Sequence, residues 1–368
     1  MTADQNWQVP DDPALLDEMM SGLRQCDAMY RPTNYWSYYD NHLLPELKTM
    51  GLKDFRRRMG SVLTSFGATD YTTDPIFKFV PLKLPFPFPG VGRINRLFDG
   101  IFRKKLEITS FYPADEVTQY LYWVVKKKLE GIGADIRKCP TSPWGNPVDL
   151  VEIDGALWST LHLNYCTMWA DASQHIEFKP DMIYCELGTG MGRQVEVLAQ
   201  LYRDATFLMF DIPPQLYVAH QYLRQVFGPR VINYRDAVKL EPGADGNIPA
   251  AAKGKILLMP SWRLPAWAHA KADIFWNSAS FQEMEPDVVE NYLGLATRMR
   301  PRWIYITALP EGNWWGGWKP GKGGTKEQVK DDCYFRSLSG NYDLHCRYFT
   351  DHILRKPQYV SYIFRKKE

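Results

Sequence analysis

Residues 184–193 read Tyr-Cys-Glu-Leu-Gly-Thr-Gly-Met-Gly-Arg, and the prediction of the fold starts from this stretch. A short apolar run leads into it and a helical pattern follows it, so Gly188, Gly190 and Gly192 lie where a strand ends and a helix begins. Glycine at such a place lets the backbone turn tightly and approach a ligand without a Cβ atom in the way. A glycine-rich loop is a weak signal by itself, so its meaning depends on the residues around it.

From about residue 181 onward, the sequence alternates short apolar runs with helical patterns. Strand-like runs cover residues 182–187, 206–210, 231–234, 255–259, 273–276 and 303–307, and helical patterns cover 194–202, 215–227 and 287–299. This alternation predicts an α/β fold with a parallel sheet and helices on both faces. Two more strands, at 342–350 and 359–364, follow close together. A closing antiparallel hairpin is typical of the Rossmann-like sheet of class I methyltransferases.

The chain up to residue 180 is predicted to be mainly helical, with helices near residues 11–26 and 117–129. Residues 81–89 contain too many prolines for a helix, and residues 91–106 have the pattern of an amphipathic helix with a basic polar face. We expect two domains: residues 1–180 as an acceptor-binding, lid or oligomerisation region, and residues 181–368 as a cofactor-binding domain.

The apolar face of residues 91–106 has three candidate partners: the protein's own core, a second subunit, or an anionic membrane surface. Between the last two, we favour the subunit contact, because Asp99 and Glu107 dilute the basic face. A homodimer is therefore expected ahead of a membrane-bound enzyme.

Acidic residues at set distances from the glycines indicate which ligand the loop binds. Glu186 precedes the glycines by the spacing that methyltransferases use for the amino-acid end of S-adenosylmethionine. Asp211 ends the next strand-like run, where a carboxylate accepts both ribose hydroxyls. Asp236 follows the run 231–234 and is expected to face the adenine amine. NAD fits less well, because the spacing is not GxGxxG and Glu186 would stand beside a pyrophosphate. The alternative is a glycine turn in an unrelated α/β protein, with Asp211 as a helix cap.

The sequence resembles the bacterial sugar O-methyltransferases in three places: the glycine loop, Asp-Ile-Pro-Pro-Gln-Leu at residues 211–216, and Ser-Phe-Gln-Glu-Met at residues 280–284. The resemblance covers about residues 180–300 well and the N-terminal half only loosely. It implies a class I methyltransferase fold, S-adenosylmethionine as cofactor, and a hydroxyl of a sugar or glycoconjugate as acceptor. Two alternatives remain open: a methyltransferase of a non-sugar natural product, and a non-catalytic binding or assembly module with a methyltransferase fold.

Methyl transfer to a hydroxyl needs an aligned acceptor and a group that removes its proton. The loop after the strand-like run 273–276 is expected to edge the methyl-donor pocket, with Asn277 at the cofactor, Gln282 at the acceptor and Glu283 as the general base. His175 is the second candidate for the base. Aromatic residues are candidates for stacking on a sugar, namely Tyr35 in an N-terminal cluster and Trp314 and Trp315 in a glycine-rich stretch.

Composition narrows the class of protein further. The formal net charge of +2 gives no strong attraction to nucleic acid, and no apolar run reaches the length of a transmembrane helix. The 6 cysteines include no CxxC pair, which favours reduced thiols in the cytoplasm. We see no metal-ligand spacing among the histidines or acids. We therefore expect a cytoplasmic enzyme that acts on a small-molecule or glycan acceptor without a metal, a transmembrane segment or a nucleic-acid partner.

Overall fold

The computed structural model describes residues 7–58, 61–68, 79–80, 112–312, 323–350 and 359–368. Its centre is a 7-stranded sheet in the order β10-β11-β9-β8-β5-β6-β7. The strands β5 to β9 pair in parallel, and β11 is antiparallel to both of its neighbours. The predicted α/β fold with a closing antiparallel hairpin is thereby confirmed. The strands are β5 Ile183–Leu187, β6 Thr206–Asp211, β7 Ile256–Pro260, β8 Ile274–Ser278, β9 Trp303–Ala308, β10 Tyr342–Phe349 and β11 Val360–Lys366.

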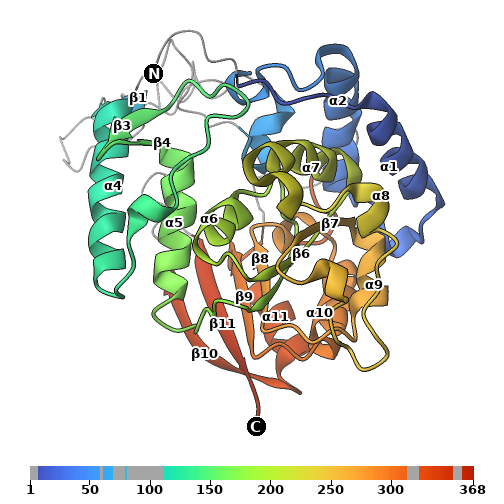
Figure 1. Ribbon diagram of the computed structural model, residues 1–368. Helices are drawn as coiled ribbons and strands as arrows, with labels where there is room; N and C mark the ends of the chain where they lie inside the picture. Colours follow the sequence, from blue (N-terminus) through green and yellow to red (C-terminus); the bar gives the residue numbers. More distant parts are fainter. Residues whose placement is uncertain (1–6, 59–60, 69–78, 81–111, 313–322, 351–358) are drawn as a thin grey trace, which may run out of the picture.

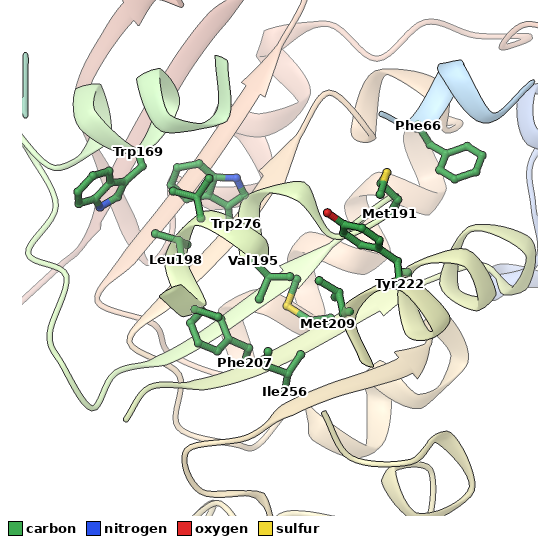
Figure 2. Close-up of a cluster of buried hydrophobic side chains, with 14 of the residues drawn as sticks. Phe66, Trp169, Met191, Val195, Leu198, Phe207, Met209, Tyr222, Ile256 and Trp276 are labelled. Carbon is green, nitrogen blue, oxygen red and sulfur yellow. The ribbon is translucent and has the colours of Figure 1, made fainter. Parts of the chain in front are cut away.

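Helices cover both faces of the sheet (Figure 1). The alternating side chains of each strand divide between two buried clusters, as in β5, where Tyr184 packs on one face and Cys185 on the other. Figure 2 shows the first cluster, in which Val195 and Leu198 lie over Phe207 and Met209 of β6. Its helices are α5 Thr160–Ala172, α6 Arg193–Leu201 and α7 Pro213–Phe227; the opposite face carries α9 Leu264–Trp267, α10 Pro286–Arg298 and α11 Asp331–Leu338.

The N-terminal region is mainly helical, as predicted, and it shares the first cluster with the sheet. Leu15 and Leu16 belong to the same buried cluster as Leu216 and Tyr217 of α7, so the hydrophobic core runs across residue 180. In Figure 1, α1 and α2 lie beside α7, and α4 lies beside α5. The elements of this region are α1 Pro13–Gln25, α2 Asn34–Met50, α4 Ala114–Glu130, and the short pairs β1 Phe79–Val80 with β2 Tyr112–Pro113 and β3 Val151–Ile153 with β4 Ala156–Trp158.

One predicted strand is wrong. Residues 231–234 form only an isolated bridge, Val231 to Ile256, and β7 takes the position beside β6. The reason is local: the side chain of Asn233 caps the short helix α8 Tyr234–Ala237 by accepting from the backbone N–H of Arg235, which ends the extended run at once. The amphipathic segment 91–106 and the proline-rich run 81–89 lie outside the described residues. Within the described residues, no helix has the length and apolar character to cross a membrane.

A buried ion pair on α6 joins the N-terminal region to the 7-stranded sheet. The Nη1 of Arg193 lies 2.9 Å from the Oε2 of Glu196, and the two side chains are 2% and 0% exposed. Glu196 also accepts from the hydroxyl of Tyr222 and the backbone N–H of Ser142, and Arg193 donates to the carbonyl oxygen of Gly67. Burial raises the pKa of Glu196, but the charges of Arg193, His162 and Arg56 and the hydrogen bond from Ser142 together outweigh it and hold that pKa below its ordinary value.

Glu196→Ala should lower the free energy of unfolding by about 3–5 kcal/mol, because it leaves the guanidinium of Arg193 buried without its carboxylate. Urea denaturation followed by circular dichroism measures this loss. The matched control is Glu290→Ala, whose carboxylate pairs with Arg336 on the surface and should leave the midpoint nearly unchanged. Equal midpoints for the two variants would contradict the role given to the buried pair.

Candidate functional site

A cavity lies at the carboxyl ends of the central strands. From β5 the chain steps outward to β6 and β7, then returns to β8 on the other side of β5, so a crevice opens where the direction of winding reverses. The space between these walls, including its open mouth, is about 1320 Å³. Its floor comes from the residues that follow four strands: Gly188 after β5, Ile212 after β6, Ser261 after β7 and Ala279 after β8.

The glycine loop at the end of β5 is packed too closely for any other residue type. The φ angles of Gly188, Gly190 and Gly192 are 78°, 56° and 84°, a region that side chains with a Cβ rarely adopt. A Cβ atom at Gly188 would stand 2.1 Å from the Oγ of Ser280, and one at Gly190 would stand 2.6 Å from the carbonyl oxygen of Phe66. These glycines are therefore required by contacts within the chain as well as by any ligand. Gly192 is the N-cap residue of α6 and does not line the cavity.

Glu186 and Asp211, the two acids that the spacing from the glycines indicated, both lie in the cavity wall. The hydroxyl of Tyr184 lies 3.4 Å from Glu186 Oε2, and burial together with the nearby charge of Asp211 raises the pKa of Glu186 well above its ordinary value. Asp211 accepts from the backbone N–H groups of Gly190, at 2.6 Å, and Ile212, at 2.7 Å. Burial raises the pKa of Asp211 to about 7 despite these two bonds. A cationic ligand in the cavity would favour the charged form of both groups.

Asp40 is a third buried carboxyl group, and the sequence did not point to it. It comes from α2, is 6% exposed, and accepts from Gln215 Nε2 at 3.3 Å. Its Oδ2 atom has no hydrogen-bond partner, and neither has the Oε1 of Gln215, which lines the cavity. Burial raises the pKa of Asp40 to about 7, helped by the nearby charge of Asp211. Gln215, the partner of Asp40, stands in the segment Asp-Ile-Pro-Pro-Gln-Leu. That motif was the one sequence feature that indicated this part of the site.

The loop after β8 brings Glu283 into the cavity but turns two predicted ligand-binding residues away from it. Asn277 is fully buried and braces the loop, donating to the carbonyl oxygen of Leu187 at 2.8 Å and accepting from the N–H of Phe281 at 3.1 Å. Gln282 donates to the hydroxyl of Tyr359 at 3.0 Å. Neither residue lines the cavity, because their polar atoms are used to hold the loop in place.

Glu283 lies in the cavity wall at the end of a 3-10 turn, Phe281–Glu283. Its Oε2 accepts from the indole N–H of Trp36 at 2.9 Å, and its backbone carbonyl accepts from the hydroxyl of Thr33 at 3.1 Å. The first turn of α2 therefore reaches across from the N-terminal region to this loop. Trp36 also lines the cavity, whereas its predicted neighbour Tyr35 does not.

Two further predictions, His175 and Asp236, do not converge on the cavity. His175 follows the end of α5 and contacts His345 and Tyr348, so it lies beside β10. His175 lies away from the cavity because Met168 is the last residue of α5 in the cavity wall, and the helix continues beyond it, away from the cavity. Asp236 lies on α8, where its side chain is 71% exposed and pairs with Lys239, which follows the helix. The strand that was expected to direct Asp236 toward the ligand is absent. Trp314 and Trp315 lie outside the described residues.

The inner face of α5 supplies cavity residues that the sequence analysis missed. Leu161, Asn164, Tyr165 and Met168 line the cavity and recur at helical spacing just before β5. The Oδ1 of Asn164 is buried without a hydrogen-bond partner, as is the hydroxyl of Thr189 in the glycine loop. Both atoms are therefore available to a ligand. Among the described residues, no group of three or more histidine, cysteine or acidic side chains is arranged to hold a metal ion.

The strand order, with β11 antiparallel to its neighbours, is that of the class I S-adenosylmethionine-dependent methyltransferases.

A scan against models of protein families finds no match, and neither does a search of curated proteins. Solved structures with a similar course of the chain include two methyltransferases. The magnesium protoporphyrin IX methyltransferase of Synechocystis, with bound SAH, is 14% identical over 56% of this chain and 84% of that chain, with a TM-score of 0.39. A SAM-dependent methyltransferase of Aquifex aeolicus is 12% identical over 53% and 88%, with a TM-score of 0.35. Because these TM-scores are low, the fold assignment depends on the strand order.

The buried carboxyl group of Asp40 makes the stability of the ligand-free protein dependent on pH. Its pKa is higher in the folded state, at about 7, than in an unfolded chain, at about 3.9. The folded state therefore binds the proton more tightly, and its stability falls as the pH rises from about 4 through about 7. Asp40→Asn removes this cost, so it should raise the melting temperature by several degrees at pH 8 and by much less at pH 5. Differential scanning fluorimetry measures the difference.

The control for that experiment is Asp17→Asn, at a carboxyl group that is 64% exposed; its effect should be small and equal at both pH values. A melting temperature of Asp40→Asn that follows wild type at pH 5 and pH 8 would show that Asp40 is not a buried ionisable group.

Proposed function

We propose that this protein transfers a methyl group from S-adenosylmethionine to a hydroxyl of a sugar or glycoconjugate, with Glu283 as the general base. One observation carries the proposal: the side chains of Glu186, Asp211 and Glu283 line the same cavity, at the carboxyl ends of the strands of a class I methyltransferase sheet. A non-catalytic module of this fold has no need of a carboxylate on the acceptor side of the cavity.

The residues of the floor fit S-adenosylmethionine. Gly188 and Gly190 line the cavity with backbone alone, and the hydroxyl of Thr189 beside them has no hydrogen-bond partner inside the protein. Asp211 would accept the ribose hydroxyls, and Glu186 would hold the ammonium group of the amino-acid end. The ligand carries a positive sulfur and an ammonium group, which would offset the cost of burying two carboxylates. When bound, the cofactor supplies a methyl group that an oxygen nucleophile can accept from sulfur.

Glu283 would remove the proton of the acceptor hydroxyl as the oxygen–carbon bond forms. Glu283 stands on the loop after β8. Ser280 of the same loop packs against Gly188, so the proposed base and the glycine loop are held close together. The proton passes from the acceptor oxygen to a carboxylate oxygen of Glu283 and leaves with the solvent after the product departs.

Two features of the cavity bear on the acceptor. Trp36, Tyr165 and Tyr359 line it with aromatic rings and hydroxyls, which suit the apolar faces and the hydroxyls of a sugar; this supports the sugar acceptor that the sequence resemblance implies. Leu161, Met168, Met284 and Val288 also line it, and these apolar side chains favour the second candidate, a non-sugar natural product with a flat apolar ring.

S-adenosylhomocysteine should bind with a dissociation constant in roughly the micromolar range. Asp211→Ala should weaken binding strongly, because the ribose loses its acceptor, and Gly190→Val should abolish it, because the new side chain meets the carbonyl oxygen of Phe66 and distorts the loop. Isothermal titration calorimetry measures both, with the surface variant Asp204→Ala as control. Wild-type affinity in both site variants would show that the cofactor binds elsewhere.

Glu283→Gln should leave the affinity for S-adenosylhomocysteine unchanged and lower turnover by roughly a hundredfold, as expected for the loss of a general base. The assay is transfer of a labelled methyl group from S-adenosylmethionine to a panel of free sugars, glycosides, nucleotide sugars and aromatic alcohols. Transfer only to the aromatic alcohols would favour the second candidate over the first. Full turnover in Glu283→Gln with loss in His175→Ala would instead identify the histidine as the base.

A further inference from the structure

We infer that Trp36 is a positioning residue for this reaction: its indole N–H sets the orientation and the charge of the Glu283 carboxyl group. The inference rests on the proposed function, since it gives Trp36 a role only through Glu283. It also means that the acceptor side of the site is completed by the N-terminal region, through a residue that lies 247 positions away in the chain.

Two hydrogen bonds from the first turn of α2 fix the segment that carries Glu283. The Nε1 of Trp36 donates to the Oε2 of Glu283 at 2.9 Å, and the hydroxyl of Thr33 donates to the backbone oxygen of Glu283 at 3.1 Å. From the other side, the backbone N–H of Glu283 donates to the carbonyl oxygen of Ser280 at 3.0 Å. The backbone is thus held at both of its polar atoms, and the bond from Trp36 restrains the side chain.

The direction of the indole N–H is itself restrained. The ring of Trp36 contacts Tyr35 at 5.6 Å, Tyr39 at 5.8 Å and Phe66 at 6.2 Å between ring centroids, and three such contacts leave it little freedom to turn. Phe66 belongs to the segment that covers the glycine loop, because its carbonyl oxygen accepts from the N–H of Met191. Trp36 therefore contacts both Glu283, the proposed base, and Phe66, which packs on the glycine loop.

A hydrogen bond from a neutral donor stabilises a carboxylate more than a carboxylic acid. Glu283 shares the cavity wall with two further carboxyl groups, Glu186 and Asp211. The one basic side chain that the described residues place in the wall, Arg31, donates to the backbone oxygens of Arg24 and Cys26. The indole N–H of Trp36 therefore favours the carboxylate form of Glu283 over the carboxylic acid.

The variant that isolates the hydrogen bond is Trp36→Phe, which keeps an aromatic ring in the cluster and removes the N–H. Its matched control is Trp7→Phe, since the Nε1 of Trp7 is buried without a hydrogen-bond partner and its ring packs on Trp144, away from the cavity. The first readout needs no acceptor: carboxyl carbon-13 signals of labelled glutamate are followed against pH, and the signal of Glu283 is identified by its absence in Glu283→Gln.

In Trp36→Phe, the midpoint of the Glu283 signal should rise by about one pH unit, which corresponds to the loss of one charge-assisted hydrogen bond; in Trp7→Phe it should stay at the wild-type value. With an acceptor found in the panel above, kcat at neutral pH should fall by about tenfold, the acidic limb of the pH–rate profile should move to higher pH, and the KM for S-adenosylmethionine should change little. A merely structural role would lower stability without moving the profile.

The outcomes separate the inference from the proposed function. If the titration midpoint of Glu283 is the same in Trp36→Phe as in Trp7→Phe, and Glu283→Gln is inactive, the role given to Trp36 is wrong while the proposed base stands. Full turnover in Glu283→Gln overturns the proposed base and, with it, the catalytic meaning of the hydrogen bond. Trp36→Phe should have no further effect on kcat in the Glu283→Gln background, and an additive loss would show that Trp36 acts by another route.

Discussion

The buried ion pair between Arg193 and Glu196 holds the site together, because it lies directly behind the glycine loop and binds three other segments. Arg193 holds the carbonyl oxygen of Gly67, which brings Phe66 over the loop, and Glu196 holds the backbone of Ser142 and the hydroxyl of Tyr222. A buried pair of this kind contributes little net stability compared with apolar packing, but breaking it is costly. Its effect here is therefore to fix one arrangement of the N-terminal region on the cofactor loop.

The N-terminal region supplies parts of the site that the methyltransferase sheet lacks. Helix α2 contributes Trp36, which donates to Glu283, and Asp40, which accepts from Gln215 in the cavity wall. The segment before residue 69 contributes Phe66, whose carbonyl oxygen accepts from the N–H of Met191 in the glycine loop. These three residues act on different parts of the cavity, yet they belong to one packed unit that shares the first hydrophobic cluster. Cofactor binding and acceptor chemistry are thus expected to depend on the same packing of α2.

The sequence predicted the sheet, and it also indicated two acids of the cavity wall, because both depend on local signals. The apolar periodicity gave all strands of the main sheet, and the spacing of Glu186 and Asp211 from the glycines placed both in the wall. The failures involve contacts between distant residues. Residues 231–234 have the composition of a strand, but an Asn cap stops them; Asn277 and Gln282 have ligand-binding chemistry, but backbone groups use it. The contacts of Trp36 and Asp40 could not be predicted, because only tertiary packing brings these side chains to residues 283 and 215.

The most direct test of the account is a crystal structure of the protein with S-adenosylhomocysteine. The account predicts the ribose hydroxyls at the carboxylate of Asp211, the amino-acid end between Glu186 and the glycine loop, and the sulfur facing the side of the cavity where Trp36 holds Glu283. Ligand density outside this cavity would contradict the central claim. So would a bound ligand whose sulfur faces away from Glu283, because no acceptor could then meet both the methyl group and the base.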